Sequence, residues 1–170
     1  MKKLLFLGLF AMSFECAAMD APQLIGDYND WSAYTYKEGK STVCYMASTP
    51  KRDEGNYTKR GDIYAVVTHR PADKSFDVVN FVAGYTLKTN AKFTVKIGKE
   101  TFTKFFTDGD KAWTINDSED QKLVKAMVRG ERMIVEGISN RGTQTKDTYS
   151  LKGFARAYKA ISAKCGKKND

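Results

Sequence analysis

Residues 92–103 read KFTVKIGKETFT, and this stretch carries the clearest structural signal in the chain. Apolar residues at positions 93, 95 and 97 alternate with polar residues at positions 92, 94 and 96. That period of two is typical of a half-buried β-strand, because successive side chains of a strand point to opposite faces. Gly98 and Lys99 then match a type II′ turn, which has glycine at its first central position. The stretch therefore predicts a β-hairpin in which Val95 lies opposite Phe102.

Strand patterns recur along the chain. Runs of β-branched and aromatic residues, or of alternating apolar and polar residues, predict strands at 31–36, 42–46, 63–68, 76–83 and 132–137. Residues 143–149 are polar and rich in threonine, which predicts an edge or surface strand.

Two helices complete the pattern. Ser118 and Gln121 have the spacing of a capping box, and Gly130 is a natural stop for the helix that follows. A second helix is expected from near Ser150 to Gly166, with one apolar stripe formed by Leu151, Phe154, Tyr158, Ile161 and Cys165. Many short strands with two helices predict a mainly β fold, a β-sandwich with two short helices, one of them at the C-terminus.

Residues 1–18 have the composition of a cleavable signal peptide. Lysines at positions 2 and 3 precede an apolar run, and small residues lead to a cleavage site after Ala18. Cys16 would also suit a lipoprotein signal, but Glu15 stands where such signals have a small residue. The apolar run is shorter than the roughly 20 residues of a transmembrane helix. We therefore expect an exported protein, with residues 19–170 as a single domain and no transmembrane segment in the mature chain.

Removal of the signal peptide would leave two cysteines, Cys44 and Cys165. Paired thiols normally oxidise in the compartments that exported proteins reach, and two cysteines allow only one connectivity. The helical stripe also directs Cys165 toward the body of the protein. These points predict a Cys44–Cys165 disulfide, and the alternative is two separate buried thiols.

The chain is basic, with a formal charge of +8 that becomes +7 when the signal peptide is lost. A basic exported protein is attracted to anionic envelope or host-surface components, whereas export argues against nucleic acid as a partner. A polar loop at residues 50–60 concentrates four cations around one aromatic residue. Its candidate contacts with an anionic surface are Lys51, Arg52, Tyr57, Lys59 and Arg60. The alternative is that Asp53 and Glu54 neutralise these cations.

Few residues suggest catalysis. His69 is the only histidine, and its position between a predicted strand and Pro71 indicates a turn or surface residue. No G-x-S-x-G elbow occurs, and one histidine with two distant cysteines does not make a zinc site. Asp117, Glu119 and Asp120 are best explained as acids that complement a helix N-terminus. We predict no catalytic, cofactor-binding or metal-binding residues.

Several motifs together resemble one protein family. They are CYMASTPK at 44–51, RGD at 60–62, VTHRP at 67–71, AGY at 83–85, SNRG at 139–142 and DTYSL at 147–151, with CG at 165–166. In this order and over nearly the whole mature chain they are similar to the invasion-associated locus B family. The resemblance implies an exported bacterial protein with an immunoglobulin-like β-sandwich, in a family whose founding members are associated with entry into host cells. It implies no catalytic residues and no cofactor.

The functional expectation combines these points. The sequence indicates a non-enzymatic envelope or surface protein that engages host or envelope components through basic loops. It would lie in the periplasm, at the outer membrane or in the medium. Two alternatives remain at this point: a periplasmic accessory protein for envelope integrity, and a hydrolase with an unrecognised site.

Overall fold

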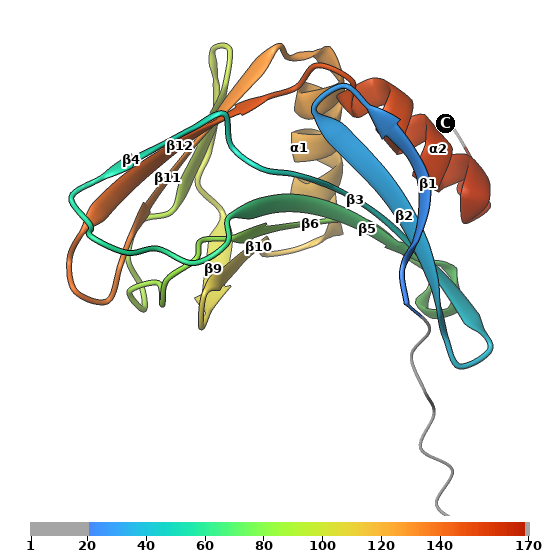
Figure 1. The fold of residues 1–170 in the computed structure, drawn as a ribbon, viewed down its shortest axis with the longest axis horizontal. Coiled ribbons are helices and arrows are strands. Elements are labelled where there is room, and N and C mark those ends of the chain that lie inside the picture. The colour runs from blue at the N-terminus through green and yellow to red at the C-terminus, as the bar shows by residue number, and fades with distance from the viewer. Residues whose placement is uncertain (1–20, 169–170) are drawn as a thin grey trace, which may run out of the picture.

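The computed structural model describes residues 21–168 (Figure 1). The expected signal peptide and its cleavage site lie outside the described residues. The elements in chain order are β1 (Gln23–Tyr28), β2 (Trp31–Glu38), β3 (Ser41–Ser48), β4 (Arg52–Gly55), β5 (Tyr64–Arg70), the 3-10 helix η1 (Pro71–Asp73), β6 (Ser75–Val82), β7 (Thr94–Ile97), β8 (Glu100–Phe102), β9 (Phe105–Asp108), β10 (Lys111–Thr114), α1 (Asp117–Arg129), β11 (Arg132–Ile138), β12 (Gln144–Ser150) and α2 (Phe154–Lys164).

The strands form two antiparallel sheets, which confirms the predicted mainly β class. One sheet has seven strands in the order β1-β2-β3-β5-β6-β10-β9, and the other has five in the order β4-β12-β11-β7-β8. The immunoglobulin-like topology is not confirmed. In an immunoglobulin domain the successive strands B and C lie in different sheets, whereas here β1, β2, β3, β5 and β6 follow one another within a single sheet.

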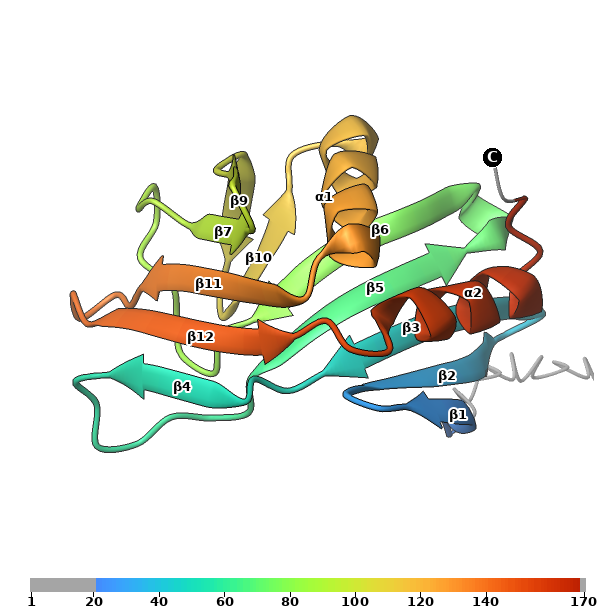
Figure 2. The same cartoon turned by 90° about the horizontal axis from the view of Figure 1, so that it is seen from above.

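The second layer has two parts. The five-stranded sheet lies over one half of the seven-stranded sheet, and α1 and α2 lie over the other half (Figures 1 and 2). Helix α1 contacts β6, and α2 contacts β1, β2 and β3. The buried side chains from both sheets and both helices form one hydrophobic cluster, whose large members include Trp31, Phe81, Met127, Tyr149 and Phe154. None of the helices within residues 21–168 has the length and apolar composition needed to cross a bilayer.

The hairpin predicted at residues 92–103 is confirmed. Strands β7 and β8 pair with Val95 opposite Phe102, and Gly98 takes a φ of 56° in the turn. Val95 and Ile97 face the core, as the alternation of the sequence requires.

The expected edge strand at residues 143–149 lies instead inside the five-stranded sheet. Strand β12 pairs with β11 on one side and with β4 on the other. Strand β4 falls within residues 50–60, which the sequence predicted as a loop. It covers the edge that β12 would otherwise expose. Thr145, Asp147 and Tyr149 lie on the face of β12 that turns toward the core, so all three are buried although two of them are polar.

Both helices begin elsewhere than predicted. The N-cap of α1 is Asn116, whose side chain accepts a hydrogen bond from the backbone N–H of Glu119 at 3.0 Å, so the capping box based on Ser118 is wrong. Helix α2 begins at Phe154 because Ser150 still belongs to β12. Gly153 caps α2 with a φ of 94°, and a Cβ atom there would lie 1.6 Å from the carbonyl oxygen of Tyr28.

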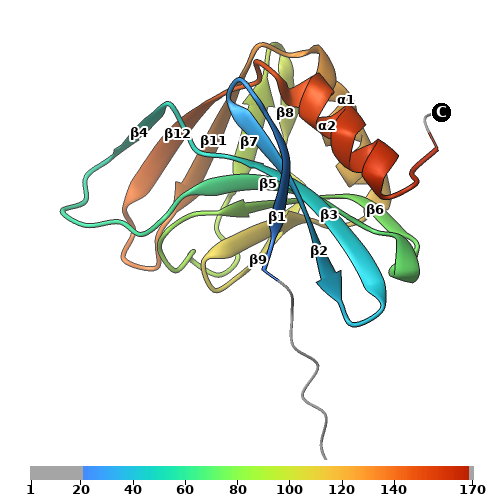
Figure 3. The ribbon, with the colours of Figure 1, turned by 45° about the vertical axis from the view of Figure 1, so that its right-hand side comes forward.

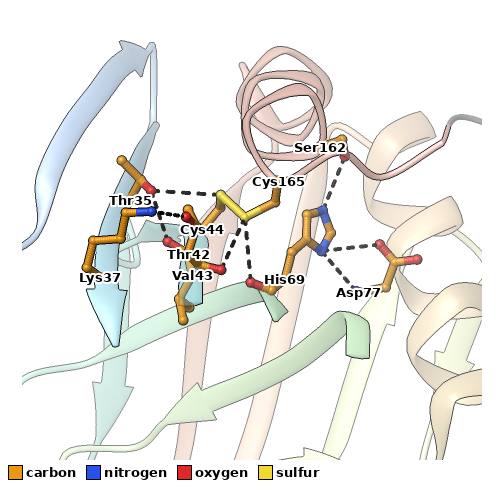
Figure 4. Close-up of a disulfide and its surroundings, with 9 residues drawn as sticks. All are labelled: Thr35, Lys37, Thr42, Val43, Cys44, His69, Asp77, Ser162 and Cys165. Carbon is orange, nitrogen blue, oxygen red and sulfur yellow. Dashed lines mark hydrogen bonds and ion pairs between the residues drawn. A yellow bond between two sulfur atoms is a disulfide. The ribbon is translucent and has the colours of Figure 1, made fainter. Parts of the chain in front are cut away.

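Cys44 on β3 and Cys165 at the end of α2 form the predicted disulfide, with an S–S distance of 2.02 Å (Figure 4). The bond attaches α2 to the seven-stranded sheet, and α2 lies beside α1 on that face (Figure 3). A disulfide is typical of an oxidising, extracytoplasmic environment.

Candidate functional site

His69 is buried, so its assignment to a turn or the surface was wrong. It lies on β5 with a side chain that is 0% exposed, between the disulfide and Asp77 and next to Ser162 of α2 (Figure 4). Its Nδ1 atom accepts a hydrogen bond from the backbone N–H of Asp77 at 3.1 Å, and its Nε2 atom lies 3.2 Å from the hydroxyl oxygen of Ser162. Burial lowers the pKa of His69 from 6.5 to about 4, although the nearby Asp77 carboxylate opposes the shift.

The trio of Ser162, His69 and Asp77 resembles a catalytic triad in composition but not in geometry. Because Nδ1 accepts a backbone N–H, the proton of the neutral imidazole is on Nε2, which then donates to Ser162. A general base must instead accept the proton of the serine. All three side chains are buried, at 0%, 0% and 3% exposure. The trio is therefore a structural hydrogen-bond network.

Asp77 extends this network to the C-terminal segment. Its carboxylate accepts hydrogen bonds from the hydroxyl of Tyr158 at 2.6 Å and from Nζ of Lys167 at 2.7 Å. Asp77 also has a φ of 64°, a conformation that non-glycine residues rarely take. The network holds the end of α2 against the turn between β5 and β6. No group of three or more His, Cys, Asp and Glu residues within 21–168 is placed to hold a metal ion.

The acidic residues at the start of α1 differ in their exposure to solvent. Asp120 is buried, and its carboxylate accepts the backbone N–H of Val79 on β6 at 2.8 Å. Burial raises the pKa of Asp120 from 3.8 to about 6, against the opposing effect of that hydrogen bond. Asp117 is exposed in the first turn, as expected for an acid that complements the helix dipole.

A cleft lies among three loops. Figure 1 shows these loops on the left, at the opposite end of the molecule from α2. These loops join β4 to β5, β6 to β7, and β11 to β12. The cleft has a volume of about 610 Å³. It is lined by Asn56, Tyr57, Thr58, Lys59, Arg60, Gly61, Gly84, Tyr85, Thr86, Ser139, Asn140, Arg141, Thr143 and Thr145.

Backbone hydrogen bonds connect the three loops. The N–H of Gly61 donates to the carbonyl of Gly84 at 2.9 Å, and the N–H of Asn140 donates to the carbonyl of Thr86 at 2.9 Å. Gly84 has a φ of 71°, and a Cβ atom there would lie 2.5 Å from the carbonyl oxygen of Gly61. The close approach of these two loops therefore requires glycine, and it fixes one wall of the cleft.

A buried ion pair forms the base of the cleft. Both terminal nitrogens of Arg60 donate to the two carboxylate oxygens of Asp147 at 2.6 Å, and Nε donates to the carbonyl of Ala83 at 2.7 Å. The two side chains are only 4% and 5% exposed. Burial alone would lower the pKa of Arg60, but its bonds to Asp147 outweigh this effect and raise its pKa. The guanidinium carbon lies 5.5 Å from the ring centre of Tyr57 and 5.0 Å from that of Tyr85.

The rim of the cleft is positively charged. Lys59 and Arg141 are exposed, and within residues 21–168 neither side chain forms an ion pair. No Asp or Glu of the described chain belongs to the lining of the cleft. Asp147, at its base, is paired with Arg60. The cleft therefore presents two available cations to any ligand that enters it.

The candidate contacts from the sequence divide into two groups. Tyr57, Lys59 and Arg60 line the cleft, but Arg60 is buried and is not an exposed cation as expected. Lys51 pairs with Asp30 at 2.5 Å and Arg52 pairs with Glu54 at 2.7 Å, both away from the cleft lining.

Tyr57 donates a hydrogen bond to Asp53 at 2.5 Å. Of the two acids that the alternative named, both in the described part of the chain, only Glu54 pairs with a cation of this loop, Arg52. Whether the cations act on an anionic surface remains a prediction.

Sequence reasoning missed the second half of the cleft. Tyr85, Ser139 and Arg141 belong to the AGY and SNRG motifs of the family resemblance, which gave them no role, and Thr143 was only part of a predicted strand. Residues 143–149 gave no guide, because polar residues stand on both faces of this strand.

Comparison with known proteins agrees with the family resemblance seen in the sequence. The family model described as Invasion associated locus B (IalB) protein matches residues 31–162. No curated protein and no solved structure gives a significant match. The matched residues run from the first core strand to the last turn of α2 and include every residue that lines the cleft. The chain therefore belongs to the invasion associated locus B (IalB) family.

Proposed function

We propose that this protein is an exported, non-enzymatic envelope or surface protein that binds an anionic component of the envelope or of a host surface. The observation that carries the proposal is the loop cleft, in which two unpaired cations, two tyrosines and several hydroxyl and amide groups surround about 610 Å³. The volume lies within the range of roughly 300–1,000 Å³ that is typical of ligand pockets.

The supports of the cleft favour binding without reorganisation. The bidentate Arg60–Asp147 pair and the bond between Gly61 and Gly84 hold the walls in place before any ligand arrives. A site that is already ordered loses less conformational entropy on binding. The arrangement of His69 with its nitrogens committed to Asp77 and Ser162 supports the non-enzymatic part of the proposal.

The test is salt-dependent sedimentation of the purified protein with isolated bacterial envelopes. We expect the variant Lys59→Gln/Arg141→Gln to bind less than wild type at low salt. The two should become equal near 1 M salt, where the Debye length falls to about 3 Å. The matched control is Lys40→Gln/Lys125→Gln, which removes two exposed lysines far from the cleft. Equal loss in both double variants would show that only net charge acts, and would overturn the cleft as the site.

Location is tested on intact cells by mild protease treatment followed by fractionation. Digestion of the protein in intact cells would place it on the surface, whereas protection until the outer membrane is opened would place it in the periplasm. Retention with the cytoplasm would overturn the exported part of the proposal.

A further inference from the structure

We infer that the ligand of the loop cleft is an acidic carbohydrate, a short chain of sugars that carries negative groups. The inference rests on the proposed function and names its ligand class. Three features of the lining lead to it: the absence of aliphatic side chains, the density of hydrogen-bonding groups, and the pairing of aromatic rings with free cations.

The lining of the cleft has no aliphatic surface on which a lipid acyl chain could pack. Of the fourteen residues that form it, none is Leu, Ile, Val, Met or Phe. An acyl chain gains affinity by burying apolar area, at about 25 cal/mol for each Å². The cleft offers that gain only on its two tyrosines, so a membrane could be held here through its headgroups alone.

Hydroxyl and amide groups dominate the walls instead. Side chains that both donate and accept hydrogen bonds come from all three loops, and they include Asn56, Thr58, Thr86, Asn140 and Thr143. A sugar presents hydroxyl groups around its whole ring, and each of them also donates and accepts. A surface of mixed donors and acceptors therefore complements a carbohydrate better than it complements a simple inorganic anion.

Tyr57 and Tyr85 supply the apolar part of the contact. Sugar rings have faces made of C–H groups, which pack against aromatic rings. Both tyrosines lie against the Arg60 guanidinium, and the Tyr85 hydroxyl is bonded to Oγ1 of Thr145 at 2.6 Å. The rings are thus held in place, and a ligand that packs on them does not have to order them first.

The free cations select a charged sugar. Lys59 comes from the loop between β4 and β5, and Arg141 comes from the turn between β11 and β12, so they approach the cleft from different walls. An arginine can hold a carboxylate through two parallel hydrogen bonds. Two cations and no free carboxylate in the lining favour a ligand with one or more negative groups.

The test is titration of the wild-type protein by calorimetry and by backbone amide NMR with four probes. The probes are trigalacturonate, the neutral trisaccharide maltotriose, vesicles of phosphatidylglycerol, and a short single-stranded DNA. We expect trigalacturonate to bind at least about tenfold more tightly than maltotriose, and to shift the amides of Lys59, Gly61 and Arg141. Arg141→Gln should weaken trigalacturonate by roughly fivefold, the upper range for a solvent-accessible ion pair. Lys40→Gln should leave it unchanged.

The other outcomes separate the inference from the proposed function. Equal binding of maltotriose and trigalacturonate would overturn the acidic carbohydrate. Binding of phosphatidylglycerol vesicles or DNA in an Arg141-dependent way, with no response to trigalacturonate, would overturn the ligand class and retain an anionic partner at the cleft. No amide shift at the cleft with any probe would overturn the inference, and the envelope sedimentation would then decide the proposed function by itself.

Discussion

Arg60 and Asp147 are 87 residues apart in the chain, and their side chains meet in a bidentate ion pair that is almost fully buried. The pair lies between the loop that follows β4 and the middle of β12. It links the two segments that form the base of the cleft. A buried pair of this kind costs little when both charges are present and a great deal when one is removed.

The substitution Arg60→Gln is therefore expected to destabilise the fold by about 3–5 kcal/mol, because it leaves the Asp147 carboxylate buried without a partner. The neighbouring variant Lys59→Gln, on an exposed side chain, should change stability by less than about 0.5 kcal/mol. Urea unfolding followed by circular dichroism measures both. Adding Asp147→Asn to Arg60→Gln should recover part of the loss, and equal stability of the two single variants would contradict the prediction.

Loss of the disulfide is expected to cost about 2–5 kcal/mol, since the Cys44–Cys165 bond joins residues 121 positions apart and restricts the unfolded chain. The comparison is denaturant unfolding of wild type, with and without reductant, and of Cys44→Ser/Cys165→Ser. The reduced wild type and the double variant should unfold at similar denaturant concentrations. Ready alkylation of both thiols in the folded, unreduced protein would show that the bond does not form.

His69 is expected to make the fold sensitive to acid. Its pKa is about 4 in the folded protein against an ordinary value of 6.5, so between these pH values the unfolded chain binds more protons. Its contribution to stability is complete above pH 6.5 and is lost as the pH falls toward 4, by up to about 3 kcal/mol. The free energy of unfolding measured from pH 7.5 to 4 should fall more steeply for wild type than for His69→Gln. Parallel profiles would contradict this role.

Asp120 is expected to have the opposite effect on the pH dependence of stability. Burial gives it a folded pKa of about 6 against an ordinary value of 3.8, so between these values the folded protein binds more protons. Its ionisation therefore lowers stability as the pH rises from 3.8 through 6. Asp120→Asn keeps an oxygen that can accept the N–H of Val79 and removes the buried charge. We expect this variant to be more stable at pH 7 by about 1–3 kcal/mol. A loss of stability at pH 7 would instead assign Asp120 a favourable charged contact.

The glycine that begins α2 is expected to tolerate no side chain. Gly153→Ala would place Cβ 1.6 Å from the carbonyl oxygen of Tyr28, in addition to the cost of a left-handed φ. Gly142→Ala is the matched control, since Gly142 has a φ of 88° with no atom within 4 Å of its Cβ position. Thermal unfolding should show a loss of about 1–2 kcal/mol for Gly142→Ala and a clearly larger loss for Gly153→Ala. Similar losses would show that α2 shifts to relieve the contact.

The local features of this protein follow from its sequence alone. The alternation at residues 92–97 and the turn glycine Gly98 specify the β7–β8 hairpin, because both act between neighbours in the chain. The disulfide was also predictable, since the two cysteines that follow the predicted signal peptide allow one pairing. The resemblance of ordered short motifs was enough to identify the family.

Tertiary structure decided which polar residues are buried. A period of two in residues 143–149 separates two faces of a strand, but both faces carry polar residues, so the pattern does not say which one turns inward. That choice depends on the packing of one face of β12 against the core, and on Arg60, which satisfies Asp147 there from 87 positions away. His69 is buried for the same reason, because Ser162 on α2 and the backbone of Asp77 satisfy its two nitrogens. The cleft exists only where three loops distant in sequence meet. Only the folded structure shows that Lys51, Arg52 and Arg60 are paired with carboxylates, whereas Lys59 and Arg141 at the cleft are in no ion pair within residues 21–168.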